Sequence, residues 1–106
     1  MIYIELGGVR YPAGILGRIR DRDWNGRESK AITLEMAFDE AKSLFTDGCP
    51  WSIVCVDENG ETAYDNGAFS MAGPITDHRN GTVTVKMGKP TAEERLAELM
   101  ARYGEI

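Results

Sequence analysis

The order of apolar and polar residues at the start of the chain predicts β-strands. Residues 2–6 alternate between the two classes, and the Gly-Gly pair that follows them is typical of a two-residue hairpin turn. A second strand is expected over residues 9–20. Pro12 and Gly14 interrupt its pattern, which favours an edge position or a bulge at that point.

A change of period marks a helix in the middle of the chain. After a loop over 21–29 and a third alternating strand over 30–36, apolar residues recur at helical spacing and predict a helix over about 37–46. The Asp-Gly-Cys-Pro sequence at 47–50 ends it. Residues 51–56 are almost continuously apolar, and we expect them to form the most central strand.

The following β signals are shorter and are separated by turns. An Asn-Gly pair precedes the first of these strands, and an Arg-Asn-Gly turn precedes the last. They predict strands over 62–64, about 68–72 and 82–87.

The end of the chain has the signature of a helix. Thr91 and Glu94 show the spacing of a capping box, and an apolar stripe follows at i, i+3, i+4 and i+7. We therefore expect a helix over about 91–103. The element order predicts an α+β fold, with an antiparallel sheet or a small β-barrel or sandwich of about seven strands and one inserted helix. We expect one domain over 1–106, with 91–106 as a helical tail.

Composition limits the chain to a single core and argues against some partners. A chain of 106 residues with 42% hydrophobic residues can build one such core. The net charge of −5 makes a nucleic-acid partner unlikely, because an acidic domain repels phosphate. The charge is uneven, since residues 10–30 hold six basic and three acidic residues and the remainder carries −8. Oppositely charged faces of two copies would attract each other.

Cysteine use and the apolar runs indicate a compartment. Cys49 and Cys55 are too few for a disulfide framework, so free thiols in a reducing cytosol are the simpler interpretation. The alternating start does not resemble a signal peptide, and no apolar run approaches 18 residues. We expect a cytoplasmic protein with no membrane association.

One motif suggests a cation site. Residues 21–26 read D-x-D-x-N-G, the first half of an EF-hand calcium loop, and place Asp21, Asp23 and Asn25 as weak candidate ligands. The twelfth loop position, where a bidentate Glu should stand, is Ile32. The alternative is an Asx-rich turn that joins two strands, and we assign no metal.

Candidates for catalysis and for cofactor binding are few. His78 is the single histidine and lies beside a predicted turn, and the carboxylate pairs do not differ from ordinary surface charge. The glycines do not match a phosphate-binding loop. We therefore expect no catalytic residues, no cofactor and no enzyme activity.

Two features point instead to protein contacts. Trp24 stands in a polar, arginine-rich loop, and Trp and Arg are common at interface hot spots. The alternative is that this loop folds back and Trp24 covers the edge of the core. The stripe of the last helix either packs on its own sheet, which is the default, or docks on a neighbouring subunit. The candidate interaction residues are Arg20, Arg22, Trp24, Arg27, Leu99, Met100 and Tyr103.

The whole chain resembles small proteins of the tail and assembly regions of tailed phages and prophages. The resemblance is carried by IYIELGGVRYPAGILGRIRDRDWNGRESKAITL, by LFTDGCPWSIV and by DHRNGTVTVKMGKPTAEERLAELM. It implies a small barrel or sandwich with one helix, as in tail-tube and baseplate-hub folds, and action by self-association or by joining ring components. The chain differs from a tube subunit in its short length and in showing no long hairpin arm.

These observations lead to one expected function and two alternatives. We expect a non-enzymatic structural or adaptor protein of phage type that acts in tail or baseplate assembly. Its partners would be copies of itself or other phage structural proteins, in the host cytoplasm or in the virion. The alternatives are a small module that binds a cation through residues 21–26, and a small enzyme of unknown class.

Overall fold

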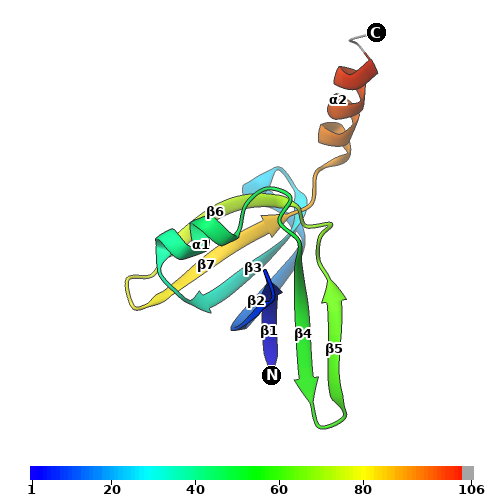
Figure 1. Cartoon of the computed structure of the whole chain (residues 1–106). Helices are drawn as coiled ribbons and strands as arrows, with labels where there is room; N and C mark the ends of the chain where they lie inside the picture. The colour runs from blue at the N-terminus through cyan, green and yellow to red at the C-terminus, as the bar shows by residue number, and fades with distance from the viewer. Residues whose placement is uncertain (104–106) are drawn as a thin grey trace.

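The computed structural model describes residues 1–103, with side chains as far as Ala101, and shows seven strands and two α-helices (Figure 1). The strands are β1 (Ile2–Leu6), β2 (Val9–Asp21), β3 (Arg27–Glu35), β4 (Trp51–Asp57), β5 (Gly60–Asp65), β6 (Met71–Asp77) and β7 (Thr82–Gly88). The helices are a short 3-10 helix (Arg22–Trp24), α1 (Phe38–Leu44) and α2 (Ala92–Tyr103).

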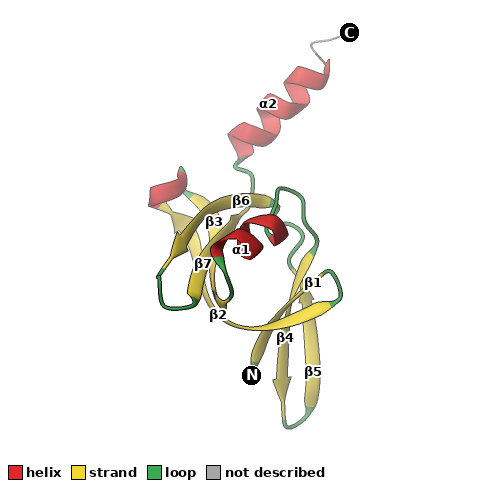
Figure 2. Ribbon diagram, turned by 60° about the vertical axis from the view of Figure 1, so that its left-hand side comes forward, coloured by secondary structure: helices red, strands yellow, loops and turns green. Residues whose placement is uncertain are grey.

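All seven strands belong to one antiparallel sheet in the order β5-β4-β1-β2-β3-β7-β6. The expected α+β class with about seven strands is therefore confirmed. The sheet bends so that β5, β4 and β1 lie against β3, β7 and β6 in a sandwich-like arrangement (Figure 2). It does not close into a barrel, because β5 and β6 end the sheet without pairing with each other.

The long strand β2 makes this bend, and it is central rather than interrupted. Its first residues pair with β1 as far as Pro12, and from Ala13 onward it pairs with β3. The backbone nitrogen of Pro12 points to the β3 side, where pairing has not yet begun, so the missing N–H removes no ladder bond. The expected bulge at Pro12 and Gly14 is wrong, because the register shift lies further along, between Arg18 and Asp21. The expected edge position is correct locally, since Pro12 pairs only with β1 and Gly14 pairs only with β3.

The expectation that residues 51–56 form the most central strand is also wrong. β4 lies next to the edge strand β5. Its side chains are buried on both faces, with Ile53 in the core and Val54 fully buried on the other side. The continuous apolar run therefore reports burial on two faces and not a position in the middle of the sheet.

The core fills the space inside the bent sheet. Trp51 from one half packs edge-on against Phe69 at 6.3 Å between ring centroids, and its indole N–H donates to the Phe69 carbonyl at 3.1 Å. Helix α1 adds Ala41, next to the β6 and β7 strands. The strand residues of the core are Ile4, Leu6, Ile32, Leu34, Ile53, Val83, Val85 and Met87.

Helix α2 leaves this body and projects from it (Figure 1). Its start is the expected capping box, which is confirmed: the Thr91 N–H donates to the Glu94 carboxylate at 2.7 Å, and the Glu94 N–H donates to the Thr91 hydroxyl at 3.2 Å. Among the described residues, no helix has the length and apolar character needed to cross a membrane.

Candidate protein-interaction site

The predicted interaction loop divides into exposed and enclosed residues. Arg20 and Arg22 are exposed, as an interface would need. Trp24 is half-buried, because the 3-10 helix folds the loop back over the outer face of the sheet. The interpretation that Trp24 covers the fold rather than standing free is therefore the correct one.

Two glycines make room for the Trp24 ring on the sheet. A Cβ atom built on Gly88 would lie 2.7 Å from the Trp24 ring, and one on Gly73 would also lie 2.7 Å from it. Any side chain at either position would collide with the indole, so the ring lies directly on the backbone of β6 and β7. The guanidinium of Arg27 stacks 4.7 Å from the ring centroid.

Arg27, another of the candidate interaction residues, is only 4% exposed. Its guanidinium donates to both oxygens of Glu94, at 2.6 and 3.0 Å, and to the carbonyls of Trp24 and Lys89. The hydrogen bond from Arg27 lowers the pKa of Glu94 to about 2, with a smaller contribution from the Thr91 N–H. Arg27 thus holds the first turn of α2 to the start of β3.

The candidate cation loop does not gather its ligands. The carboxylate of Asp21 is buried and accepts hydrogen bonds from Lys86 and Ser29, both at 2.9 Å, and from the Asp23 N–H. The bond from Lys86 is the main cause that lowers the pKa of Asp21. Asp23 and Asn25 are exposed. Among the described residues, no group of three His, Cys, Asp or Glu side chains is placed to hold a metal ion.

The residues considered for catalysis lie apart from the loop. His78 is exposed, and its Nε2 is 2.7 Å from the hydroxyl of Thr84, which in turn lies 2.9 Å from the hydroxyl of Thr33. Cys49 is buried and Cys55 is half-buried, and both thiols are free. The structure brings none of these together with Asp21 or Asp23.

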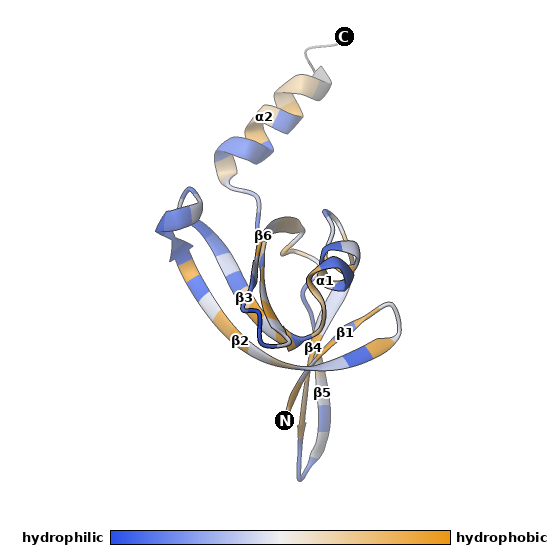
Figure 3. Ribbon diagram, turned by 90° about the vertical axis from the view of Figure 1, so that its left-hand side faces the viewer, coloured by the Kyte–Doolittle hydropathy of each residue, from blue (hydrophilic) through white to orange (hydrophobic). Residues whose placement is uncertain are grey.

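The stripe on α2 faces solvent instead of the sheet, so the default expectation that it packs on its own body is wrong. Leu96, Leu99 and Met100 are 58%, 48% and 64% exposed. Figure 3 shows apolar residues on a helix that stands clear of every strand. The side chain of Tyr103, the fourth candidate of the stripe, lies outside the described residues.

The structure also contains a stretch of β2 that lacks a paired strand on one side, which was not expected from the sequence. β1 is five residues long and β2 is thirteen, so β1 covers only the start of one side of β2. From residue 14 to residue 19 that side has no paired strand among the described residues, and we call this segment the open edge. The mismatch in strand length, visible once the Gly-Gly hairpin fixes the register, is the signal that could have revealed it.

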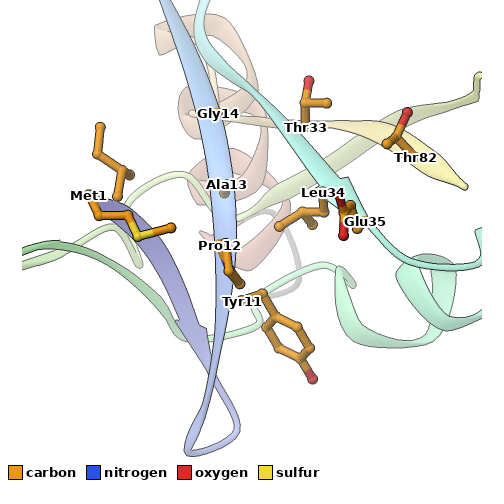
Figure 4. Close-up of a pocket in the computed structure, with 10 residues that line it drawn as sticks. Met1, Tyr11, Pro12, Ala13, Gly14, Thr33, Leu34, Glu35 and Thr82 are labelled. Carbon is orange, nitrogen blue, oxygen red and sulfur yellow. The ribbon is translucent and has the colours of Figure 1, made fainter.

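The open edge begins at a shallow pocket of about 500 Å³ (Figure 4). Met1 lies on one side of it, Pro12 and Gly14 of β2 form its floor, and Thr33 and Glu35 of β3 lie on the other side. In Figure 4 the β1 and β2 ribbons diverge at this place, and β2 continues beyond the end of β1. The pocket is therefore a consequence of the same strand mismatch.

The open edge is positively charged. Arg18 lies on it and Arg20 and Arg22 come shortly after it, and no ion pair joins any of the three to a carboxylate within the described part of the chain. Leu16 and Ile19 of the open edge are 60% and 89% exposed. Exposed backbone, apolar side chains and unpaired cations thus occur together on one strand.

Comparison of the chain with models of protein families, with curated proteins and with solved structures finds no match.

Proposed function

We propose that this chain is a non-enzymatic structural or adaptor protein that works by binding other protein chains. The observation that carries the proposal is α2, a helix of twelve residues that projects from the body with Leu96, Leu99 and Met100 exposed. A helix this short is marginally stable in water without tertiary packing. An apolar stripe held away from its own sheet fits a helix that packs on another protein.

The anchoring of α2 supports the same function. Arg27 and Glu94 fix the first turn of the helix to the start of β3, and the capping box sets its direction. The helix therefore leaves the body at a defined place, and a partner would meet a preorganised first turn, which reduces the entropy lost on binding.

The proposed setting is the tail or baseplate assembly of a phage or prophage, and it depends on the resemblance of the sequence. Partners would then be other phage structural proteins or further copies of this chain. The protein would work in the host cytoplasm or as part of the virion.

Light scattering tests this function. The full chain is measured from micromolar to millimolar concentration, by itself and mixed with the proteins encoded beside its gene. We expect complexes, and we expect Leu99→Glu combined with Met100→Glu to weaken them. Ala97→Glu combined with Ala101→Glu is the matched control, since it adds the same two negative charges away from the apolar stripe.

Two results would count against the function. One is a single chain of 11.7 kDa at every concentration and with every neighbouring protein. The other is a stripe variant that associates as strongly as the unaltered chain.

A further inference from the structure

We propose that the open edge of β2 adds the β5 strand of a second copy of this chain, so that copies join head to tail through a shared sheet. The inference rests on the proposed function and names one partner and one surface for it. It uses strand edges, whereas the proposed function is carried by α2, so the two can fail separately.

The backbone of the open edge is ready to pair. Met1, directly before β1, and Val56 of β4 exchange two backbone hydrogen bonds, and this fixes which residues of each neighbouring strand point to which side. By alternation, Gly14, Leu16 and Arg18 direct their N–H and C=O groups to β3. Ile15 and Gly17 direct theirs away from β3, where the described chain offers no partner. A strand that docks there would satisfy these groups.

The edge of β5 is free in the same way. All six of its residues are exposed, and β5 is the last strand on its side of the sheet. The pairing of β4 with β5 directs Glu61, Ala63 and Asp65 outward. This strand contains no proline and no register shift.

The other two edges fit less well. β6, at the opposite end of the sheet, carries Pro74 and a register shift between Ala72 and Ile75, and both features protect an edge from pairing. A second β2 edge would bring Arg18 and Arg20 of two copies together. Like charges on neighbouring strands repel, which disfavours a symmetrical β2–β2 contact.

Charge favours β5 as the occupant. Residues 57–65 contain four carboxylates and no basic residue, whereas Arg18 on the open edge and Arg20 directly after it have no ion-pair partners among the described residues. Glu61 already binds Arg10 in a bidentate pair, whereas Glu58 at the tip of the hairpin is exposed. The two edges are complementary in charge and in backbone.

The contact would be heterologous, because it joins two different surfaces of the same chain. A joined pair of copies still has one free open edge and one free β5 edge, so that further copies close into a ring if the rotation permits and extend as a filament otherwise. A symmetrical dimer is not expected from this surface.

Two proline variants test the contact. Gly17→Pro removes an outward N–H from the open edge, and Ala63→Pro removes one from β5. Neither N–H has a backbone partner among residues 1–103, so both variants should fold. Gly17→Ala and Ala63→Ser keep the N–H at the same positions and serve as matched controls.

Sedimentation at high protein concentration measures whether each variant associates. Each proline variant should sediment at the 11.7 kDa mass of the single chain, while both controls associate like the unaltered chain. An equimolar mixture of the two proline variants should form a complex of twice that mass that does not grow further, because each supplies the edge that the other lacks.

Several outcomes would overturn the inference. These are an unaltered chain that stays single at every concentration, a Gly17→Pro variant that associates normally, or a mixture that stays monomeric. If Ala63→Pro still dimerises, the contact is β2–β2 and not β2–β5. An unaltered chain that is single but binds a neighbouring protein through the α2 stripe would reject this inference and leave the proposed function standing.

A second set of variants tests the charge complementarity without removing a backbone N–H. Arg18→Glu combined with Arg20→Glu should abolish association, and the same protein mixed with a Glu58→Lys variant should regain part of it. Association that resists both the charge reversal and high salt would contradict the role of these arginines.

Discussion

The guanidinium of Arg27 binds both carboxylate oxygens of Glu94, and this pair joins a buried position of β3 to the first turn of α2. The sheet thus determines where the helix begins, although the helix packs none of its stripe on the sheet. Thr91 completes the junction through the capping box.

Loss of the cap should loosen α2 and leave the sheet intact. Thr91→Ala removes the hydroxyl that accepts the Glu94 N–H, and such a change costs about 1 kcal/mol of helix stability. Amide exchange over residues 95–101 should speed up by about fivefold, as that free energy implies, while exchange in β3 and β7 stays unchanged. Thr91→Ser keeps the hydroxyl and should behave like the unaltered chain; equal exchange in both variants would exclude the capping role.

Acid should weaken the anchor of α2. The pKa of Glu94 is lowered from 4.5 to about 2, mainly by Arg27, so the folded protein binds this proton less readily than the unfolded chain does. The stabilisation is therefore complete above about pH 4.5 and is lost as the pH falls toward 2. Denaturant unfolding followed across this range should show a smaller loss for Glu94→Gln than for the unaltered chain. Identical pH profiles would contradict this origin.

The packing of Trp24 on β6 and β7 should be sensitive to one methyl group added at Gly88. Gly88→Ala puts a Cβ within 2.7 Å of the indole and should destabilise the fold by about 1–3 kcal/mol in denaturant unfolding. Gly17→Ala meets no atom within 4 Å and should be neutral or stabilise by a few tenths of a kcal/mol. In the Trp24→Ala background the Gly88→Ala change should lose part of its effect, and the Arg27 Cδ, 2.8 Å from the same Cβ, accounts for the remainder. An unchanged penalty there would show that another contact is responsible.

The sequence predicts where strands and helices occur better than it predicts which strands lie side by side. The strand and helix patterns and the capping box follow from local periodicity, and most of them occur close to the expected ranges. The exception is the strand expected over about 68–72, which lies at Met71–Asp77. The position of β4 and the continuity of β2 through Pro12 depend on which strands lie beside them. A local pattern does not contain that information, because an apolar run looks the same in a central strand and in one near the edge.

The candidate site was only partly predictable for the same reason. The exposed stripe on α2 is visible as helical periodicity. The burial of Arg27 could not be predicted, because it depends on Trp24 and on Glu94, which is 67 positions away. The open edge needed the lengths of β1 and β2 together with their register.

Asp21 should be important for stability and Asp23 should not. Asp21→Asn keeps the shape of the side chain but removes the charge that pairs with Lys86, so the melting temperature should fall by several degrees. Asp23 is exposed, and Asp23→Asn is the matched control with little expected change. Similar melting temperatures for both variants would mean that the Lys86 pair contributes nothing to stability.

Amide exchange of the open edge tests the account most directly. In dilute solution the Ile15 and Gly17 amides should exchange fast, because they point away from β3, while Leu16 is protected by its bond to β3. In concentrated solution Ile15 and Gly17 should become protected together with Glu61 and Ala63 of β5. If these four amides exchange equally fast at both concentrations, the open edge of β2 does not pair with another copy.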